Sequence, residues 1–351
     1  MKIYYPSSHY NKTYRVQVFP LLKPFIKGEN FTDENRREMY GVSAKDYYFV
    51  NNMVEAELVV LPMAWNYYVQ TNQLHLAYKL VKEAEKAGKR VWSWNAGDYG
   101  VKIPEFKNLN VFRMSGYGSR KQRGHEGLPS MIKDRLEKYS KENFSDFPDN
   151  KQPIVGFCGQ ADAAWSKALQ EQTKIIYRNL KSLVGLSPHE PQTVVATTKL
   201  RASLLAQLER HPKIRTNFIL RKKYRAGVST PEEREKTTQE FYQNINSSQY
   251  VLCVRGAGNF SVRFYETLMM GRIPLYVHTD GFLPLSNKID WKHHVVWVDE
   301  KEIDQLGEKL VKFHQERTQK DLLGIAKKNR QLWKDYLTLD GFFKSSYQMH
   351  S

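Results

Sequence analysis

The segment from Tyr250 to Val277 constrains the fold of this chain most strongly, because it encodes a strand, a turn, a helix and a second strand. Tyr250–Val254 is a short apolar run typical of a strand. Helical spacing follows over Val262–Met270, and Gly271 is placed to end that helix. Ile273–Val277 is the next apolar run. A parallel sheet with covering helices is therefore expected, and such sheets hold ligands at turns like this one.

The turn itself contains Gly256 and Gly258. Free backbone N–H groups and the dipole of the following helix favour an anion such as phosphate at this point. Arg263 and Glu266 are three residues apart, so they share one face of the helix. A cation and a carboxylate beside an anion-binding turn suit a ligand with phosphate and hydroxyl groups. Taken alone, the pattern is equally compatible with two turn glycines and an ordinary surface ion pair.

Several short motifs lie within this segment and on either side of it, in a fixed order. They are Arg255-Gly256, Ser261-x-Arg263-x-x-Glu266, Gly271-x-Ile273-Pro274, Asp290-Trp291, Glu302-Ile303-x-x-Leu306 and Leu332-Trp333-x-x-Tyr336, preceded by Phe157-x-Gly159 and the strand Glu55–Pro62. Together they resemble the core of the exostosin-like glycosyltransferases. The resemblance is strong over about residues 250–300 and patchy elsewhere.

The resemblance implies that a nucleoside-diphosphate sugar binds to the second of two domains, and that a glycan acceptor binds to the first. UDP-sugars are the first expectation. The donor residues expected from matched or neighbouring positions are Arg255, Gly256, Gly258, Asn259, Ser261, Arg263 and Glu266, together with Arg221 and Asp280 after adjacent strands. The two matched arginines, at 255 and 263, would pair with the diphosphate, because guanidinium groups match phosphate oxygens.

The resemblance also implies inversion at the anomeric carbon, which needs one general base to deprotonate the acceptor hydroxyl. Asp98 is the first candidate, because it lies in a glycine-flanked loop directly after the predicted strand Arg90–Trp94. His125 and Glu126, in a second glycine-containing loop, come next. A loop aspartate that merely caps a turn is an equally good explanation for the first of them.

The chain contains no Asp-x-Asp sequence, the pair with which many glycosyltransferases of the other major fold hold a divalent cation. Positive side chains stand near the expected diphosphate instead. We therefore expect no metal requirement and no cofactor, with the nucleotide sugar acting as a substrate.

Strands and helices alternate along both parts of the chain, which predicts parallel sheets. The expected strands are Met1–Tyr5, Glu57–Leu61, Arg90–Trp94, Leu109–Phe112, Ile154–Cys158, Thr193–Thr197, Thr216–Leu220, Tyr250–Val254, Ile273–Val277 and Val295–Val298. The expected helices are Asn72–Ala87, Ile132–Lys141, Ala164–Val184, Ser203–Arg210, Pro231–Ile245, Val262–Met270, Ile303–Gln315 and Leu322–Tyr336.

Ser145–Pro153 concentrates Ser, Asp, Asn and Pro, as linkers do. We predict an α/β protein of GT-B type, with two Rossmann-like domains facing a central cleft. The predicted divisions are an acceptor domain over 1–148, a donor domain over 149–325, and a C-terminal helix over 326–351 that packs back on the first domain, with Leu322–Tyr336 as its candidate.

The formal net charge is +17. The segment from Lys199 to Arg225 contains nine Lys or Arg residues, and Glu209 is its single acidic residue. Nucleic acid, an anionic membrane and an anionic substrate would each explain this excess. Because no zinc-finger spacing, RNP signature or basic zipper is present, we expect no specific nucleic-acid partner. A nucleotide sugar, an acidic or lipid-linked glycan, and peripheral contact with an anionic membrane fit the charge better.

Only two cysteines are present, Cys158 and Cys253, both inside expected strands. No apolar run approaches the roughly 20 residues that span a bilayer, and the N-terminal residues lack the apolar core of a secretory signal. We expect reduced thiols and a cytoplasmic protein, at most peripheral at the inner face of a membrane.

The leading hypothesis is a cytoplasmic inverting glycosyltransferase that extends a glycan or polysaccharide. A transferase of similar architecture that moves a non-sugar group to a polysaccharide is the alternative. A basic nucleic-acid-binding protein is the third hypothesis.

Overall fold

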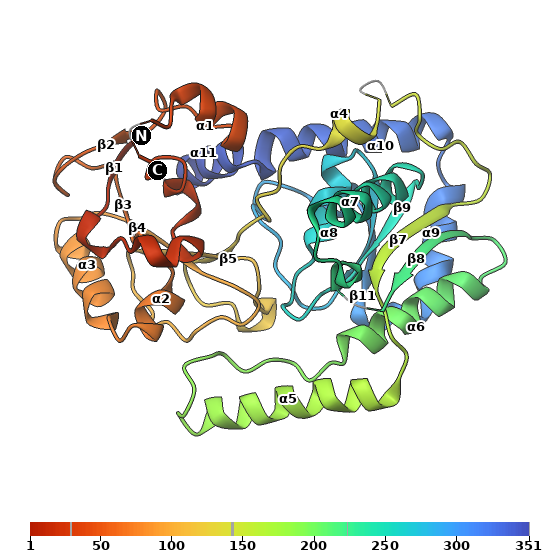
Figure 1. The fold of residues 1–351 in the computed structure, drawn as a ribbon, viewed down its shortest axis with the longest axis horizontal. Helices are drawn as coiled ribbons and strands as arrows, with labels where there is room; N and C mark the ends of the chain where they lie inside the picture. Colours follow the sequence, from red (N-terminus) through yellow and green to blue (C-terminus); the bar gives the residue numbers. More distant parts are fainter. Residues whose placement is uncertain (29, 142–143, 223, 351) are drawn as a thin grey trace.

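The computed structural model describes residues 1–28, 30–141, 144–222 and 224–350, and Figure 1 shows them as two α/β halves. The strands are β1 Lys2–Tyr4, β2 Tyr48–Phe49, β3 Leu58–Val60, β4 Val91–Asn95, β5 Leu109–Arg113, β6 His125–Gly127, β7 Ile154–Gln160, β8 Arg215–Arg221, β9 Tyr250–Cys253, β10 Ile273–His278 and β11 Val296–Asp299. The α-helices are α1 Asp33–Tyr40, α2 Trp65–Gln70, α3 Leu74–Lys86, α4 Leu136–Tyr139, α5 Trp165–Leu183, α6 Thr197–Arg210, α7 Pro231–Asn246, α8 Val262–Met269, α9 Leu306–Gln315, α10 Gln319–Leu332 and α11 Leu339–His350.

Each half is built on one parallel sheet. The first sheet has the strand order β2-β1-β3-β4-β5-β6 and the second β11-β10-β9-β7-β8. Every residue of β3, β4, β5 and β9 is buried, as expected for strands that are covered on both faces. Helix α3 covers its sheet through Ala77, Leu80, Val81 and Ala84, whose spacing places them on one stripe.

The chain returns from the second half to the first at its C-terminus. Helix α10 packs on the second half, where Arg330 Nη1 donates to the carbonyl of Met269 at 2.9 Å. A π-helical turn over Trp333–Leu337 then leads into α11, which lies with the first half in Figure 1. The returning helix is therefore α11, and the prediction that Leu322–Tyr336 plays this part was wrong.

Two parallel-sheet halves and a returning C-terminal helix make the GT-B fold that the sequence predicted. The proposed divisions at 148/149 and 325/326 stay predictions. Helix α4 already packs on the second half, where the Tyr139 ring stacks on Tyr242 of α7 with centroids 4.9 Å apart.

Several local predictions need correction. Thr193–Thr197 forms no strand, since α6 begins at Thr197 and the residues before it are irregular. Ile132–Lys141 contributes only the single turn α4. The short strands β2 and β6 and the helices α1 and α2 were not predicted, whereas α11 lies within the predicted C-terminal segment 326–351.

None of the helices within the described ranges combines the length and the apolar character that crossing a bilayer requires.

Candidate functional site

The strand order of the second sheet reverses between β7 and β9, and open α/β sheets have their crevice at such a point. From β7 the chain moves outward to β8, whereas from β9 it moves in the opposite direction to β10. The loops after β7 and β9 therefore diverge, and ligands of open α/β sheets bind at such a point. The sequence predicted this position through the turn that joins β9 to α8.

The turn between β9 and α8 is held by its own backbone. The N–H of Gly256 donates to the carbonyl of Phe260 at 3.0 Å, and the N–H of Phe260 donates to that of Gly258 at 2.9 Å. Ser261 is the N-cap residue of α8, as predicted, but its side chain makes no capping hydrogen bond. The helix therefore presents an N-terminus with its positive dipole end at the crevice.

Arg201 and Arg263 come from different helices and lie close enough for their charges to interact, while Arg255 lies in the loop after β9 with its guanidinium at Tyr117. Arg263 of α8 donates from Nη2 to the carbonyl of Cys158 at 2.8 Å, and its guanidinium lies 4.2 Å from the centroid of Phe157. Arg201 of α6 donates to the carbonyl of Gln160 and to that of Arg255, each at 3.2 Å. The loops after β7 and β9 are thus clamped by cationic side chains.

These guanidinium groups are crowded and incompletely bonded. Burial lowers the pKa of Arg263, while burial and the charge of Arg263 together lower the pKa of Arg201 to about 10. The Nε atoms of Arg201, Arg255 and Arg263 are buried without a hydrogen-bond partner. Because buried donors are normally satisfied, this group of arginines, which we call the arginine cluster, is suited to an anion that accepts from several guanidinium groups.

Two predicted donor residues lie beside this cluster. Glu266 accepts from the hydroxyl of Tyr242 at 3.4 Å, and its charge favours the protonated form of Arg263. Arg221 turns toward α7 instead, where it donates to Glu240 at 3.2 Å and to the carbonyl of Thr237 at 2.8 Å. Its charge is therefore offset by Glu240, although its Nε is buried without a hydrogen-bond partner like those of Arg201, Arg255 and Arg263.

Two other predicted donor residues join the halves. The Asn259 side chain donates to the carbonyls of Gly116 and Thr279 at 3.0 and 2.7 Å, and accepts from the Thr279 hydroxyl at 2.7 Å. Asp280, with φ of 59°, accepts from the backbone and the hydroxyl of Ser119, at 3.0 and 2.6 Å. These contacts position the first half over the turn between β9 and α8, which we call the donor turn after its predicted role.

Asp98 lies at the tip of a pinned loop that faces the donor turn. The side chain of Asn95 bonds both backbone groups of Val101, at 3.0 and 2.9 Å, which closes the loop. The N–H of Gly258 donates to the Asp98 carboxylate across the two halves. Asp98 stays exposed, yet crowding by protein atoms raises its pKa, an effect that the Gly258 N–H and Arg178 partly offset.

The side chains of His125 and Glu126 point to opposite faces of the sheet, because the two residues are neighbours on β6. His125 is buried with its Nδ1 3.3 Å from Arg113, and burial together with that charge lowers its pKa to about 4. Glu126 is paired with His350 of α11 at 2.6 Å. Of the three predicted bases, only Asp98 faces the donor turn.

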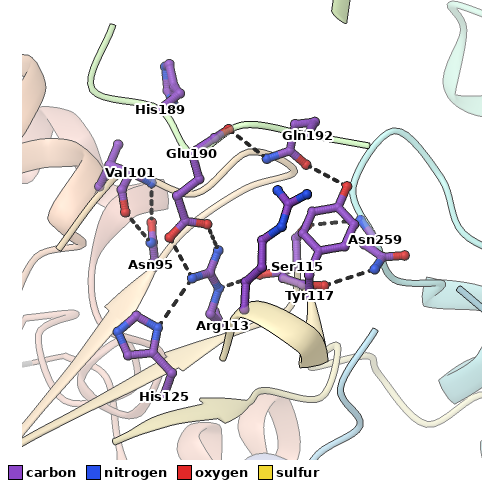
Figure 2. A network of polar contacts seen from close by, with 12 residues as sticks. Asn95, Val101, Arg113, Ser115, Tyr117, His125, His189, Glu190, Gln192 and Asn259 are labelled. Carbon is purple, nitrogen blue, oxygen red and sulfur yellow. Dashed lines mark hydrogen bonds and ion pairs between the residues drawn. The ribbon is translucent and has the colours of Figure 1, made fainter. Parts of the chain in front are cut away.

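A polar network between the halves was not predicted, and Figure 2 shows it. Arg113 makes a bidentate ion pair with Glu190, and the hydroxyl of Tyr117 donates to Gln192 at 3.2 Å. Tyr117 also accepts from Arg255 at 3.3 Å, so the network reaches the arginine cluster. Arg113 and Glu190 are 77 positions apart, and no local pattern marks the pair.

Within the described ranges, no three His, Cys, Asp or Glu side chains gather closely enough to hold a metal ion. A separate cavity of about 450 Å³ lies between α4 and α7, lined by residues such as Lys138, Asp146 and Glu235. It lies apart from the arginine cluster. The crevice at β7 and β9 is therefore the candidate site.

Comparison with known proteins finds similar sequences in the same region. Residues 165–313 match the Exostosin GT47 domain. Exostosin-1 of Drosophila melanogaster is 29% identical over 105 residues, which cover 30% of this chain and 13% of that protein. The probable glucuronosyltransferase GUT1 of Oryza sativa subsp. japonica is 32% identical over 68 residues, 19% of this chain and 16% of that protein.

The chain thus spans well under a fifth of the length of these curated relatives. Among solved structures, that of Anabaena Alr3699/HepE in complex with UDP-glucose aligns over 100% of this chain and 99% of its own, at 10% identity and a TM-score of 0.38. The fold assignment rests on the sheets and the returning helix described above, because a TM-score this low adds nothing to it.

Proposed function

We propose that this chain, whose residues 165–313 match the Exostosin GT47 domain, is an inverting glycosyltransferase that moves a sugar from a UDP-sugar to a glycan. The arginine cluster carries the proposal. Arg201, Arg255 and Arg263 have unpartnered Nε donors, and these residues lie at the loops after β7 and β9 beside a helix N-terminus. A diphosphate supplies the acceptors that these donors lack.

The proposed reaction is a direct displacement at the anomeric carbon. The acceptor oxygen forms a bond to that carbon as the bond to the diphosphate oxygen breaks, and the acceptor proton passes to Asp98. The leaving nucleoside diphosphate gains negative charge at that moment. Arg201, Arg255 and Arg263 stabilise this charge, because fixed cations aimed at a leaving group lower the barrier.

Other donor contacts follow from position. The Ser261 hydroxyl, free of a capping role, is placed to donate to a phosphate oxygen, and Glu266 is placed to accept from ribose or sugar hydroxyls. We assign Asn259 and Asp280 to holding the halves together, and Arg221 to the rim of the site. We also propose that transfer needs no metal ion, because arginine side chains lie where the diphosphate is expected to bind.

We propose a glycan acceptor in the first half, close to the Asp98 loop, and the net charge of +17 suits an acidic or lipid-linked one. Cys158 and Cys253 are buried free thiols. They are compatible with the reducing cytoplasm as the place of action.

Binding of UDP tests the arginine cluster directly. We expect UDP to raise the melting temperature of the full chain, and Arg201→Ala to weaken UDP about 10- to 100-fold, as expected for a lost charge-assisted contact. Arg210→Ala is the matched control, since Arg210 lies on the same helix α6 but is exposed. Equal UDP affinity in both variants would contradict the site.

The assignment of α8 has its own test. Arg263→Ala and Glu266→Ala should each remove most transfer activity, measured with a panel of nucleotide sugars and glycan acceptors. Folding of each variant is checked by circular dichroism, because Arg263 also packs on Phe157. Catalysis that survives both substitutions would place the donor elsewhere.

A further inference from the structure

Helix α5 carries a row of apolar side chains that the described parts of the chain leave exposed. Trp165, Leu169, Ile176, Leu180 and Leu183 are 78%, 65%, 47%, 56% and 72% exposed. Their spacing of four, seven, four and three residues places them on one face of the helix, and we call this face the stripe. Single apolar residues on a surface are ordinary, whereas a continuous row of this size marks an interaction surface.

Contacts elsewhere on the helix hold the stripe in a fixed direction. The Arg178 guanidinium lies 3.8 Å from the ring centroid of Tyr99 in the first half. Asn179 exchanges two hydrogen bonds with Gln192, at 2.7 and 2.8 Å. Figure 1 shows α5 along the lower edge of the molecule. A partner can therefore dock on the stripe while these contacts stay in place.

The charged side chains of α5 lie away from the stripe. Its lysines repeat every seven residues and share the opposite face of the helix: Lys167, Lys174 and Lys181. Lys167 is paired with Asp162 before the helix. Glu171 accepts from the hydroxyl of Thr198 in α6, and Arg178 turns to the first half. The stripe therefore lacks the adjacent cations with which a helix at a membrane surface meets anionic lipids.

The edges of the stripe are uncharged along its length. The edge residues are Ser166, Gln172, Thr173, Tyr177 and Val184. The hydroxyl of Thr173 donates to the carbonyl of Leu169 at 2.8 Å, so its donor stays satisfied when water is excluded. Lys199 of α6 stands at one end, with its Nζ 2.9 Å from the ring centroid of Trp165. A partner surface that is itself apolar and uncharged fits this stripe best.

The stripe is complementary to itself. Two helices that pack antiparallel about a two-fold axis bring residues equally far from the axis into contact. The pairs Trp165–Leu183 and Leu169–Leu180 are centred on nearly the same point of the helix, and Ile176 lies between them. An antiparallel copy of α5 would therefore place Trp165 against Leu183 and Leu169 against Leu180, twice over.

We propose that the stripe is the contact through which two copies of this chain form a two-fold symmetric dimer, with α5 packed antiparallel on its counterpart. Together with the exposed Tyr177, Val184 and Leu186 beside it, the stripe presents an area comparable to the roughly 800 Å² per partner of a standard interface. The lysines of α5 stay in water on the outer faces. The net charge of +17 per copy opposes the approach of two chains, and salt screens that repulsion.

Sedimentation velocity of the full chain over a range of concentrations tests the dimer without nucleotide, so its outcome is independent of the proposed function. We expect a monomer–dimer equilibrium with a Kd on the order of micromolar, tighter at raised salt. Leu169→Glu should weaken it at least about 100-fold, because each copy would bury an unpaired charge. Val54→Glu is the matched control, since Val54 is 77% exposed in the loop before β3. Wild type that stays monomeric, or a Leu169→Glu variant that dimerises equally well, would overturn the proposal.

A mixing experiment tests the antiparallel register. Leu180→Lys alone should also be monomeric, for the same reason as Leu169→Glu. An equal mixture of the two variants should dimerise again, because one contact then pairs glutamate with lysine and the other keeps both leucines. A mixture that stays monomeric contradicts this register. Wild type that sediments as a monomer but floats with anionic vesicles, in a manner lost in Leu169→Glu, would assign the stripe to a membrane instead.

Discussion

Asp98 is the residue on which the proposed chemistry depends most. Its carboxylate is exposed, faces the N–H of Gly258 across the two halves, and sits on a loop that Asn95 holds closed. We predict that Asp98→Asn lowers kcat by a factor of about 10² to 10⁴, the usual contribution of a general base. UDP binding should persist, because the arginine cluster is untouched. Steady-state kinetics beside a UDP titration check both expectations.

The pH profile separates a base from a residue that only caps a turn. The surrounding protein raises the pKa of Asp98, and only the ionised carboxylate accepts a proton. Transfer should therefore fall as the pH drops through this pKa, at a pH above that expected for an ordinary aspartate. If Asp98→Asn leaves the decrease of the transfer rate at the same low pH, another group causes that decrease and acts as the base.

His125 allows a stability prediction with a definite sign. Its pKa falls from an ordinary 6.5 to about 4 because it is buried beside Arg113. As the pH falls, the imidazole of His125 is protonated in the unfolded chain at a higher pH than in the folded chain. Protonation therefore favours unfolding, so the free energy of unfolding is unaffected by His125 above pH 6.5 and decreases as the pH falls toward 4. The loss should be on the order of 3 kcal/mol at most. Urea unfolding of wild type and His125→Gln at several pH values between 7 and 4 gives the free energy of unfolding at each pH. This free energy should decrease less with falling pH in the variant than in wild type.

At the scale of elements, α11 fastens the C-terminus to the first half. Phe343 is fully buried, with its ring centroid 5.3 Å from Phe19 and 5.6 Å from both Trp92 and Phe112. We predict that Phe343→Ala lowers the free energy of unfolding by about 3–5 kcal/mol, the cost of a cavity of that size. Gln348→Ala, on an exposed position of the same helix, should change it by less than about 0.5 kcal/mol. Similar effects of the two substitutions would mean that α11 does not dock as described.

Elements with strong local signals could be predicted from the sequence, and others could not. Gly271 ends α8 as predicted, with φ of 58°, because that left-handed conformation favours glycine. The apolar run Tyr250–Val254 forms β9, because aromatic and β-branched residues favour a buried strand. Thr193–Thr197 has the residues of a strand, yet Thr193 bonds Tyr117 of the first half and α6 starts at Thr197. A tertiary contact overrode the local preference there.

At the scale of the whole molecule, the contacts that complete the site join residues far apart in the sequence. Ser115 and Asn259 meet across 144 positions, and Arg113 and Glu190 across 77. Periodicity cannot reveal such pairs, so the sequence predicted the turn between β9 and α8 but not how the first half closes over it. For the same reason Asn259 was expected to bind the donor, whereas its side chain is occupied by Gly116 and Thr279.

The interface between the two halves therefore depends on the side chain of Asn259. We predict that Asn259→Ala speeds hydrogen exchange of residues 114–118 and 279–282, because it removes the bonds to Gly116 and Thr279 and leaves both carbonyls without that donor. Transfer should fall, while UDP binding, which rests on the arginine cluster, changes little. Asn287→Ala, at an exposed position in the loop after β10, is the control. Unchanged exchange in 114–118 together with weakened UDP binding would instead return Asn259 to the donor site, and the two halves would then be held together chiefly by Glu190 and Asp280.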